Sequence, residues 1–464
     1  MTKPKATTKT EHLILGHISD IHFRKKAPDS DIYVSDDDLR SELVNDIGQF
    51  KSKFGNFHGI LITGDIAFAG DKDEYARARS WVRDLCKKTD CPEELVWTIS
   101  GNHDVIRSVI NRSAILQEIQ KAIRAAGAAE KFEAIDAKIL NYFADSAAPD
   151  LLFNSIQEYN NFAKISQCGF NSKRPFWEQN VLLNDGSTLR IRGLNSALVS
   201  NKDDDRGANK LVLGPMFSCL PREDGVEYMV LCHHPPQWLW DEDKINDYLN
   251  SRARLVLFGH KHVQRIKEEI TGGHQVLRIH AGALNPDAGE AQYLPRYNCL
   301  RIRVVKPGTD RALEVEVIQR VWDAEKTSFS DGACQKHELK LPPWSPPASD
   351  PESLEPATAA KAEPLITLSD PLNVLTQDPV KARMLSAPRK LAYRFLDLPY
   401  HVQIEIAQAL NLLKDEDEGQ SEDELFRRFF HRAADEGRLG ELWREVEKKY
   451  TDGEPENNPF KKMQ

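Results

Sequence analysis

The sequence predicts an α/β protein in which a two-sheet β-sandwich is flanked by helices and carries a helical insert, with a separate all-α bundle at the C-terminal end. Three observations lead to this fold class. Short apolar runs alternate with helix-like stretches over the first 262 residues. Later runs alternate apolar and polar residues, as strands with one wet face do. A Pro-rich segment then precedes a C-terminal part with helical periodicity.

Five apolar runs, each typical of a buried strand, end at a polar block. The runs cover residues 12–19, 59–64, 94–100, 228–232 and 254–258. Helix-like stretches at 37–50 and 74–87 lie between the early runs, which indicates crossover connections in a sheet. Because polar groups at the carboxyl ends of such strands gather along one rim, the five blocks are expected to meet. The blocks are Asp20-Ile21-His22, Gly64-Asp65, Gly101-Asn102-His103-Asp104, His233-His234-Pro235-Pro236 and Gly259-His260-Lys261-His262.

The blocks supply carboxylates, imidazoles and one amide, which are suitable ligands for two divalent metal ions. Two ions held roughly 3.5–4 Å apart can activate water and bind a phosphate oxygen. Gly64, Gly101 and Gly259 open or precede ligand blocks, where glycine permits a sharp turn and a close approach to a metal or phosphate. One block alone would indicate only an ordinary turn after a strand, whereas all five in order indicate a metal site.

The combined pattern resembles that of the calcineurin-like metallophosphoesterases, D-x-H, G-D, G-N-H-[DE], H and G-H-x-H, over about residues 12–325. The resemblance implies a hydrolase that uses hydroxide activated by two metal ions. Mixed nitrogen and oxygen ligands suit Mn, Fe, Zn or Co and do not choose among them. The implied ligands are Asp20, His22 and His262 for the first ion, Asn102, His233 and His260 for the second, and Asp65 as the bridge between them.

Three further residues of the blocks lie outside the implied ligand set. His103 is expected to protonate or stabilise the leaving oxygen, a task that suits a histidine with a pKa near neutrality. Asp104 either orients His103 or caps the following helix. The family's ligand is the histidine directly after the strand, which is His233, so His234 either faces the substrate, supports the ligands or is merely exposed. Histidines outside the motifs are expected not to contact metal, namely His12, His17, His58, His274, His280 and His337.

The stretch after Asp65 bears on the substrate. Gly70-Asp71-Lys72-Asp73-Glu74-Tyr75 is similar to the G-x-x-x-E-Y segment of the phosphodiesterase branch, and it departs from the G-D-x-x-D-R-G pattern of protein phosphatases. The resemblance implies a phosphodiester substrate, for which a cyclic nucleotide, another nucleotide and a nucleic acid are the candidates. A phosphomonoesterase, or a non-catalytic binding protein on the same fold, is the alternative.

Residues 105–168 form an insert with apolar residues at helical spacing. It is either a cap and specificity wall beside the site or a helical hairpin that only packs against the sheet. Residues 202–206 are expected to be a solvated loop. Residues 181–183 and 189–192 flank an Asn-Asp-Gly-Ser hairpin signal. Together with 300–304 and 313–317, they are expected to complete a second sheet.

The domain division follows from composition. We expect a polar tail over 1–11, a catalytic domain over 12–340, a Pro-rich linker over 341–369 and a helical domain over 370–464. The last domain is similar to bacterial effector-associated domains, small adaptors that pair with like domains on partners in defence and signalling. The resemblance implies a protein partner, reached through the surfaces of Ile404, Phe429 and Trp443. The alternative is a bundle that docks on its own catalytic domain or self-associates.

Composition limits the class of protein further. The 464-residue chain has a net charge of −9, which argues against broad coating of nucleic acid but not against a strand that enters a metal-lined cleft. Seven cysteines without regular spacing indicate reduced thiols. No signal peptide and no apolar stretch of transmembrane length are apparent, so a cytoplasmic location without membrane contact is expected.

Overall fold

The structure is a computed structural model that describes residues 12–25, 35–129, 132–286, 294–306, 308, 310–345, 391, 395, 398, 400–414, 417 and 422–449. The predicted tail over 1–11 and most of the predicted linker lie outside these residues. The chain divides into two compact units, residues 1–349 and 350–464. None of the described helices combines the length and the apolar character needed to cross a bilayer.

The first sheet of the larger unit has six strands in the order β12-β11-β10-β1-β2-β3. Strands β1 (Leu13–Ile18), β2 (Gly59–Thr63) and β3 (Val96–Ile99) are parallel, and all their residues are buried. Helices α1 (Ser35–Phe54) and α2 (Lys72–Thr89) form the two crossovers, as the sequence predicts. Strands β10 (Arg296–Val305), β11 (Ala312–Asp323) and β12 (Ser328–Lys340) follow as an antiparallel meander.

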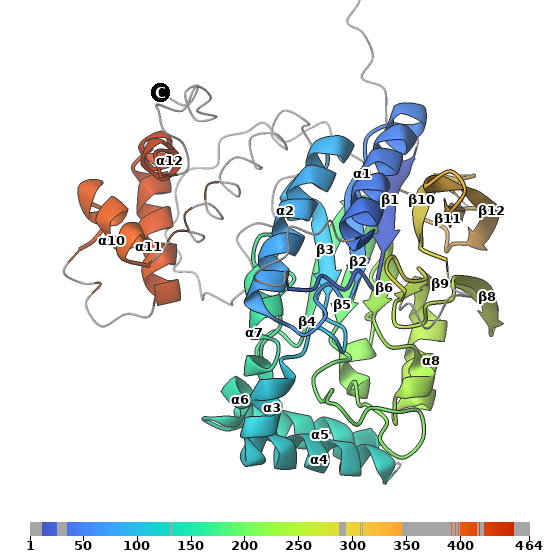
Figure 1. The fold of residues 1–464 in the computed structure, drawn as a ribbon, viewed down its shortest axis with the longest axis horizontal. Coiled ribbons are helices and arrows are strands. Elements are labelled where there is room, and N and C mark those ends of the chain that lie inside the picture. The colour runs from blue at the N-terminus through green and yellow to red at the C-terminus, as the bar shows by residue number, and fades with distance from the viewer. Residues whose placement is uncertain are drawn as a thin grey trace, which may run out of the picture. The chain divides into compact units, whose positions relative to one another are not determined.

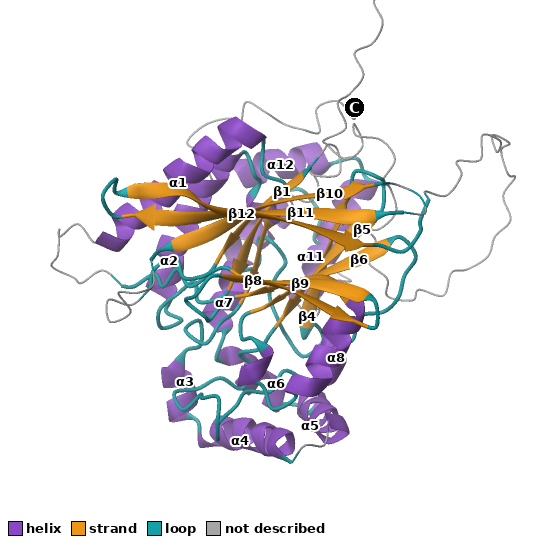
Figure 2. Ribbon diagram, turned by 90° about the vertical axis from the view of Figure 1, so that its right-hand side faces the viewer, coloured by secondary structure: helices purple, strands orange, loops and turns teal. Residues whose placement is uncertain are grey.

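The second sheet also has six strands, in the order β4-β5-β6-β7-β9-β8. The predicted hairpin is confirmed as β4 (Phe176–Leu182) and β5 (Thr188–Leu194). Strands β6 (Val226–Cys232) and β7 (Ala253–Phe258) are parallel to β5 and are joined by α8 (Glu242–Arg252). Strands β8 (Arg265–Thr271) and β9 (His274–His280) close the sheet. Figure 2 shows the two sheets as stacked layers, with α1 and α8 on opposite outer sides.

One prediction about the late strands is wrong. Residues 300–304 and 313–317 do not complete the second sheet, because β10 pairs antiparallel with β1 in the first sheet. Their alternating pattern records which face of a strand is buried, but it does not record which strand lies beside it. The five polar blocks were expected along the edge of one sheet, but they come from both sheets. Strands β1, β2 and β3 supply three blocks from one sheet, and β6 and β7 supply two from the other.

The insert is helical, as predicted. It comprises α3 (Arg107–Arg112), α4 (Ala114–Ala128), α5 (Phe132–Ala144), α6 (Ala148–Asn154) and α7 (Gln157–Phe162). Figures 1 and 2 both show α3 to α6 gathered at one end of the unit. Helix α4 packs on the loop at 199–209, where Arg124 donates to the carbonyl of Val199 at 2.6 Å. The solvated loop predicted at 202–206 is wrong in one respect, because Asp204 is largely buried and paired with Arg124.

The larger unit continues past the predicted boundary at residue 340. The side chain of Leu341 is buried, and its N–H donates to the carbonyl of Arg311 at 2.9 Å. Trp344 lies under the guanidinium of Arg311, whose central carbon is 5.4 Å from the ring centroid. Residues 341–344 are therefore part of the folded unit rather than of a free linker.

The smaller unit contains α10 (Tyr400–Ala409), α11 (Glu422–Asp435) and α12 (Leu439–Glu447). The prediction that Phe429 and Trp443 form a partner surface is wrong, since they are only 2% and 5% exposed within the apolar core of this unit. Ile404 is partly buried against the same core. An amphipathic stripe looks the same in sequence whether it covers its own core or a partner.

Candidate metal centre

The backbone is strained at the ends of the strands that lead into the site. Asp20, His22, Asp65 and His260 all have positive φ, between 52° and 62°. Such conformations are uncommon for residues other than glycine and persist where surrounding structure holds them. All four residues were predicted as metal ligands. The strain fixes the directions of their side chains, which is the kind of backbone feature that clusters at functional sites.

The glycines of the blocks let the ligand loops pack against one another. A Cβ at Gly101 would lie 2.2 Å from Oδ1 of Asp65, and one at Gly259 would lie 2.3 Å from Oγ of Ser19. A Cβ at Gly64, where φ is +92°, would lie 2.5 Å from Nδ1 of His233. The close approach predicted for these glycines is thus made to neighbouring ligand loops.

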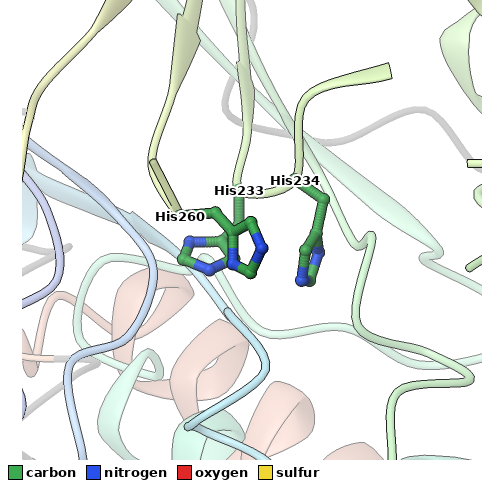
Figure 3. Close-up of side chains that lie close together, drawn as sticks. All are labelled: His233, His234 and His260. Atoms are coloured by element: carbon green, nitrogen blue, oxygen red, sulfur yellow. The ribbon is translucent and has the colours of Figure 1, made fainter. Parts of the chain in front are cut away.

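Three imidazoles converge on one amide oxygen in the group of residues predicted to hold the second ion. Oδ1 of Asn102 lies 3.1 Å from Nε2 of His233, 3.1 Å from Nε2 of His234 and 3.0 Å from Nδ1 of His260. Figure 3 shows the three rings beside one another, from the ends of β6 and β7. The sequence predicts Asn102, His233 and His260 together, and the structure adds His234 to them.

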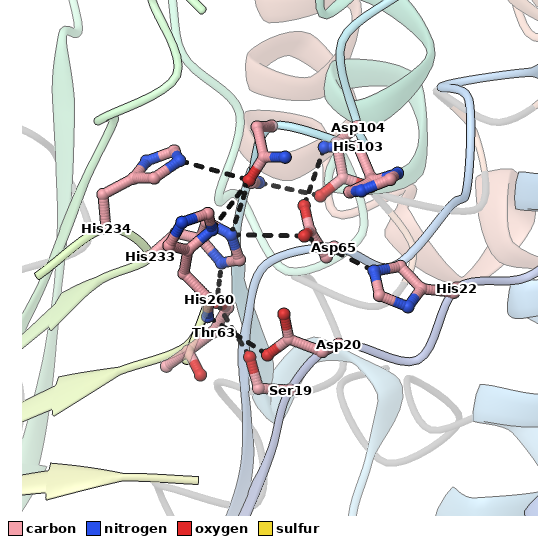
Figure 4. Close-up of polar contacts among 12 residues, drawn as sticks. Ser19, Asp20, His22, Thr63, Asp65, His103, Asp104, His233, His234 and His260 are labelled. Carbon is pink, nitrogen blue, oxygen red and sulfur yellow. Dashed lines mark hydrogen bonds and ion pairs between the residues drawn. The ribbon is translucent and has the colours of Figure 1, made fainter. Parts of the chain in front are cut away.

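Asp65 lies between the two groups of predicted ligands. Its Oδ2 is 3.4 Å from Nε2 of His22 and 3.3 Å from Nε2 of His233. Its Oδ1 accepts a hydrogen bond from the backbone N–H of His103 at 2.8 Å. Figure 4 shows Asp65 between His233 and His22. This is the position expected of a carboxylate that bridges two ions.

Asp20, His22 and His262, the residues predicted to hold the first ion, also come together. Nε2 of His262 lies 3.7 Å from Oδ1 of Asp20, and the rings of His22 and His262 are 6.0 Å apart. Oδ2 of Asp20 accepts from the backbone N–H of His260 at 3.2 Å. The structure therefore brings all seven predicted ligands into one cluster.

Backbone carbonyls fix the orientation of two key imidazoles. Nδ1 of His22 donates to the carbonyl of Asn285 at 3.3 Å, and Nδ1 of His233 donates to the carbonyl of Thr63 at 2.7 Å. A carbonyl only accepts, so each ring carries a proton on Nδ1 and turns Nε2 to the cluster. This outer hydrogen bond is typical of metal-binding histidines.

The donor atoms fit divalent metal ions on two grounds. Two ligands bound about 2.1 Å from one ion at ordinary coordination angles lie roughly 3.0–3.4 Å apart. The separations around Asn102 Oδ1 and Asp65 Oδ2, from 3.0 to 3.4 Å, match this range. In addition, Oδ1 of Asp20 is buried with no hydrogen-bond partner among the described residues. A buried carboxylate oxygen without a partner is costly unless a cation satisfies it.

The charges within the cluster are strongly coupled. Burial raises the pKa of Asp65, but the charge of His233 and hydrogen bonds from His22 and His233 outweigh it and hold that pKa well below its usual value. Burial lowers the pKa of His233, but Asp65 raises it to about 9 overall. Burial and the neighbouring imidazoles lower the pKa of His234 and of His260 well below the ordinary value. Both of these rings are thus neutral at pH 7 and offer a nitrogen lone pair.

Asp104 joins the two ligand loops, which neither alternative for this residue anticipated. Its Oδ1 accepts from the N–H of Ala67 at 2.9 Å and from the hydroxyl of Tyr75 at 2.7 Å. Its Oδ2 accepts from the N–H of Gly101 at 2.8 Å and of Ile66 at 3.3 Å. Asp104 therefore ties the loop that carries Asp65 to the loop that carries Asn102.

The G-x-x-x-E-Y segment has a structural role as well. Glu74 accepts from the N–H groups of Ala69 and Asp71 in a capping box at the start of α2. Tyr75 binds Asp104. Both side chains support the ligand loops, so the segment does not by itself identify the substrate.

His103 and His234 lie at opposite ends of the cluster (Figure 4). Nδ1 of His103 donates to the carbonyl of Phe68 at 2.8 Å, and one of its ring nitrogens lies within 4.8 Å of ligand atoms of His22 and Asp65. His234 is buried, and its Nδ1 is 2.8 Å from Oγ of Ser196. His17 and His58 do not belong to the cluster. The former bonds Thr63 Oγ1 at 3.1 Å and the latter accepts from the N–H of Ile14 at 3.0 Å.

The sequence analysis missed two aromatic residues beside the cluster. Phe68 is 36% exposed, and its ring lies 5.2 Å from that of His103. Trp238 follows the Pro-Pro pair at the end of η3 (Pro236–Trp238) and contacts His260 edge to face at 4.1 Å. Their positions next to ligand blocks were the available signal.

Comparison with known families agrees with the motifs. A profile described as calcineurin-like phosphoesterase matches residues 14–264, and one described as a GTPase-associated adaptor domain matches residues 387–448. The prediction of a C-terminal adaptor is thus confirmed, under a different family description from the effector-associated domains. Among curated proteins the comparison found no match.

Several solved structures are similar to this chain at low identity. Vps29 from Entamoeba histolytica is 10% identical with a TM-score of 0.29, covering 70% of this chain and 99% of its own. A putative 5'-nucleotidase from Staphylococcus aureus is 12% identical with a TM-score of 0.32, covering 73% and 56%. A phosphatase from Mycoplasma pneumoniae is 9% identical with a TM-score of 0.29, covering 72% and 95%. At these scores the neighbours carry no functional argument.

Proposed function

Because this chain belongs to the calcineurin-like phosphoesterase family, we propose that it is a phosphodiesterase acting on a nucleotide or nucleic acid at a centre of two divalent ions. Membership of the family makes the chain a metal-dependent phosphoesterase. The diester preference, the assignment of each ligand and the identity of the metal go beyond the family match. Mn is our working choice among Mn, Fe, Zn and Co.

The proposed ligands are those that the motifs indicate. Asp20, His22 and His262 would hold one ion, and Asn102, His233 and His260 the other. Asp65 would help to hold both ions, since its carboxylate lies 3.3 Å from an imidazole of one group and 3.4 Å from an imidazole of the other. Two divalent ions bound there would polarise a phosphate oxygen and lower the pKa of a water molecule. His234 would hold Asn102 in place from the far side, through its 3.1 Å contact with Oδ1.

His103 is the proposed proton donor to the leaving oxygen. Its Nδ1 is engaged by the carbonyl of Phe68, so Nε2 is the nitrogen left to exchange a proton with substrate. Its backbone N–H holds Oδ1 of Asp65, which ties the position of the ring to the bridging ligand. Such a donor contributes typically 10²–10⁴-fold to the rate.

One observation supports the proposal most strongly. Imidazoles of both groups approach Asp65 Oδ2 at separations that suit shared ligation, and both are held by backbone carbonyls on their other nitrogen. A binding protein that had lost its metals would have no need of this arrangement or of the strained backbone beneath it.

The smaller unit is proposed to bring the enzyme to a protein partner in the cytoplasm. The adaptor description of the matched profile supports protein binding, and its reference to GTPases suggests a partner that carries a GTPase or a like adaptor domain. Bacterial defence or signalling is the setting that we propose.

Hydrolysis of two nitrophenyl substrates tests the function. The protein would be stripped of metal, loaded with Mn²⁺ and assayed with bis(p-nitrophenyl) phosphate and with p-nitrophenyl phosphate. We expect a higher kcat/KM for the diester, with activity lost in Asp65→Asn. Asp241→Asn is the matched control, because Asp241 is also a buried carboxylate but binds the N–H groups of Leu213 and Gly214 away from the cluster. A preference for the monoester would overturn the diester assignment, and no hydrolysis of either by metal-loaded protein would overturn catalysis.

A further inference from the structure

Both ends of the ligand cluster carry an aromatic ring with an arginine over it. At the His103 end, the central carbon of the Arg24 guanidinium lies 4.4 Å from the centroid of the Phe68 ring. At the His260 end, that of Arg206 lies 5.7 Å from the centroid of the Trp238 ring. Phe68 and Trp238 each contact an imidazole of the cluster, at ring separations of 5.2 and 4.1 Å. The two pairs therefore adjoin the site directly.

The Phe68 end is hollow and rich in cations. A cavity of about 690 Å³ is lined there by Phe68, His103, Ile106 and charged side chains. Two of the three acidic residues in the lining are already engaged, because Asp71 pairs with Lys25 at 2.6 Å and Glu74 binds backbone N–H groups. Glu158 is the third. The cations that line the cavity are Arg24, Lys25, Lys72 and Arg107. The insert forms part of this wall through Ile106 to Ser108 and Glu158.

The Trp238 end also gathers positive charge. The half-buried Lys261 lies between ligands His260 and His262, and its Nζ is 3.4 Å from Oε1 of Gln237. Arg206, whose guanidinium lies over the Trp238 ring, is the second cation at this end. Positive charge on both sides of the site contrasts with the net charge of −9 for the whole chain.

We propose that the substrate is a single-stranded oligonucleotide that crosses the metal centre, with a base on Phe68 on one side and a base on Trp238 on the other. Alternating aromatic faces and cations along a path are the features that bind unpaired bases and their phosphates. A duplex keeps its bases stacked on each other and offers neither face to Phe68 or Trp238. A cyclic mononucleotide has one base and one phosphate, so it would leave one of the two ends unused. This inference rests on the proposed phosphodiesterase function.

Binding to metal-free protein tests the inference separately from catalysis. Full-length protein in EDTA would be titrated into fluorescein-labelled 12-mers of dT and of U, a labelled 12-base-pair duplex, and unlabelled cyclic AMP as competitor. The slope of the logarithm of the binding constant against the logarithm of the salt concentration gives the number of phosphates contacted, at about −0.7 per contact for single strands. Four contacts, from Arg24, Arg107, Arg206 and Lys261, predict a slope of about −3.

Variants then locate the path. Phe68→Ala and Trp238→Ala are each expected to weaken binding of the 12-mer by roughly tenfold, whereas Phe68→Tyr and Trp238→Phe restore most of it. Arg206→Gln is expected to reduce the salt slope by about 0.7. Lys87→Gln is the charge control, since Lys87 is 76% exposed on α2 and makes no contact with either end.

Turnover provides the second readout. In Mn²⁺-loaded Phe68→Ala and Trp238→Ala, the ratio of oligonucleotide hydrolysis to bis(p-nitrophenyl) phosphate hydrolysis is expected to fall at least tenfold. If wild-type protein cleaves the nitrophenyl diester but binds duplex or cyclic AMP more tightly than either 12-mer, the inference fails and the proposed function stands. If both aromatic variants bind the 12-mer as wild type does, the inference also fails. If no diester of any kind is cleaved, the proposed function fails, and the substrate assignment fails with it.

Discussion

Replacing Asp104 tests whether the metal centre depends on one buried carboxylate. Asp104 is fully buried and accepts four hydrogen bonds, from the N–H groups of Ile66, Ala67 and Gly101 and from the hydroxyl of Tyr75. Burial, and then the charge of Asp65, raise the pKa of Asp104 to about 6. Asp104→Ala would leave all four donors without this acceptor.

The size of the effect follows from the number of donors left unpaired. A buried donor without a partner costs about 1–3 kcal/mol, and water that enters the vacated space offsets part of the total. We expect Asp104→Ala to lower the free energy of unfolding by about 3–5 kcal/mol. Asp104→Asn keeps one oxygen but turns an NH₂ group toward the N–H of Ala67 or of Gly101, at about 1–3 kcal/mol. Tyr75→Phe removes a single bond, at about 1–2 kcal/mol.

Urea unfolding in EDTA, followed by tryptophan fluorescence, would rank the three variants without a contribution from bound metal. Metal content after reloading would show whether the loops of Asp65 and Asn102 still hold their ligands in register. Two results would refute the reasoning. One is an Asp104→Ala protein within about 0.5 kcal/mol of wild type, which is the scatter of ordinary surface changes. The other is a Tyr75→Phe protein as unstable as Asp104→Ala.

Three more outcomes are expected. His103→Ala should keep its bound metal and lose about 10²–10⁴-fold in kcat on substrates with poor leaving groups, but less on nitrophenyl esters; equal losses on both would remove the proton-donor role. Burial raises the pKa of Asp241 to about 6, above the unfolded value of about 3.9, so wild-type stability falls as pH rises through this range. The free energy of unfolding of Asp241→Asn relative to wild type should therefore rise by roughly 1 kcal/mol between pH 5 and 7.5, and a pH-independent difference would count against the assignment. A chain ending after residue 345 should fold and cleave bis(p-nitrophenyl) phosphate, because Leu341 and Trp344 complete the larger unit. A chain ending at residue 340 lacks both side chains and should melt at a measurably lower temperature. Equal melting temperatures for the two chains would contradict this.

The sequence predicts well those parts of the fold whose residue pattern is compatible with one structure only. The runs before Asp20 and Asp65 are apolar throughout because β1 and β2 are buried on both faces. The polar residues that follow them then have only the strand ends to occupy. The hairpin of β4 and β5 was equally accessible, because an Asn-Asp-Gly-Ser turn joins two strands of matched length.

The features that the sequence did not predict depend on partners far away in the chain. The pattern of residues 300–304 predicts a half-buried strand that could belong to either sheet. Its place in the first sheet follows from its pairing with β1, which the pattern does not show. Asp104 is adjacent to His103 in sequence, yet its partners are 3 to 38 residues away. Phe429 and Trp443 lie on stripes that cover the core of their own unit. In each case the sequence shows a side chain's chemistry without its neighbour.

The number of Mn²⁺ ions bound per chain tests the central claim most directly. Calorimetric titration of Mn²⁺ into metal-free wild-type protein should give two ions per chain, and Asp65→Asn, which alters the oxygens shared by both groups, should lose at least one of them. A wild-type stoichiometry of one or zero, or an unchanged stoichiometry and affinity in Asp65→Asn, would contradict a centre of two ions bridged by Asp65.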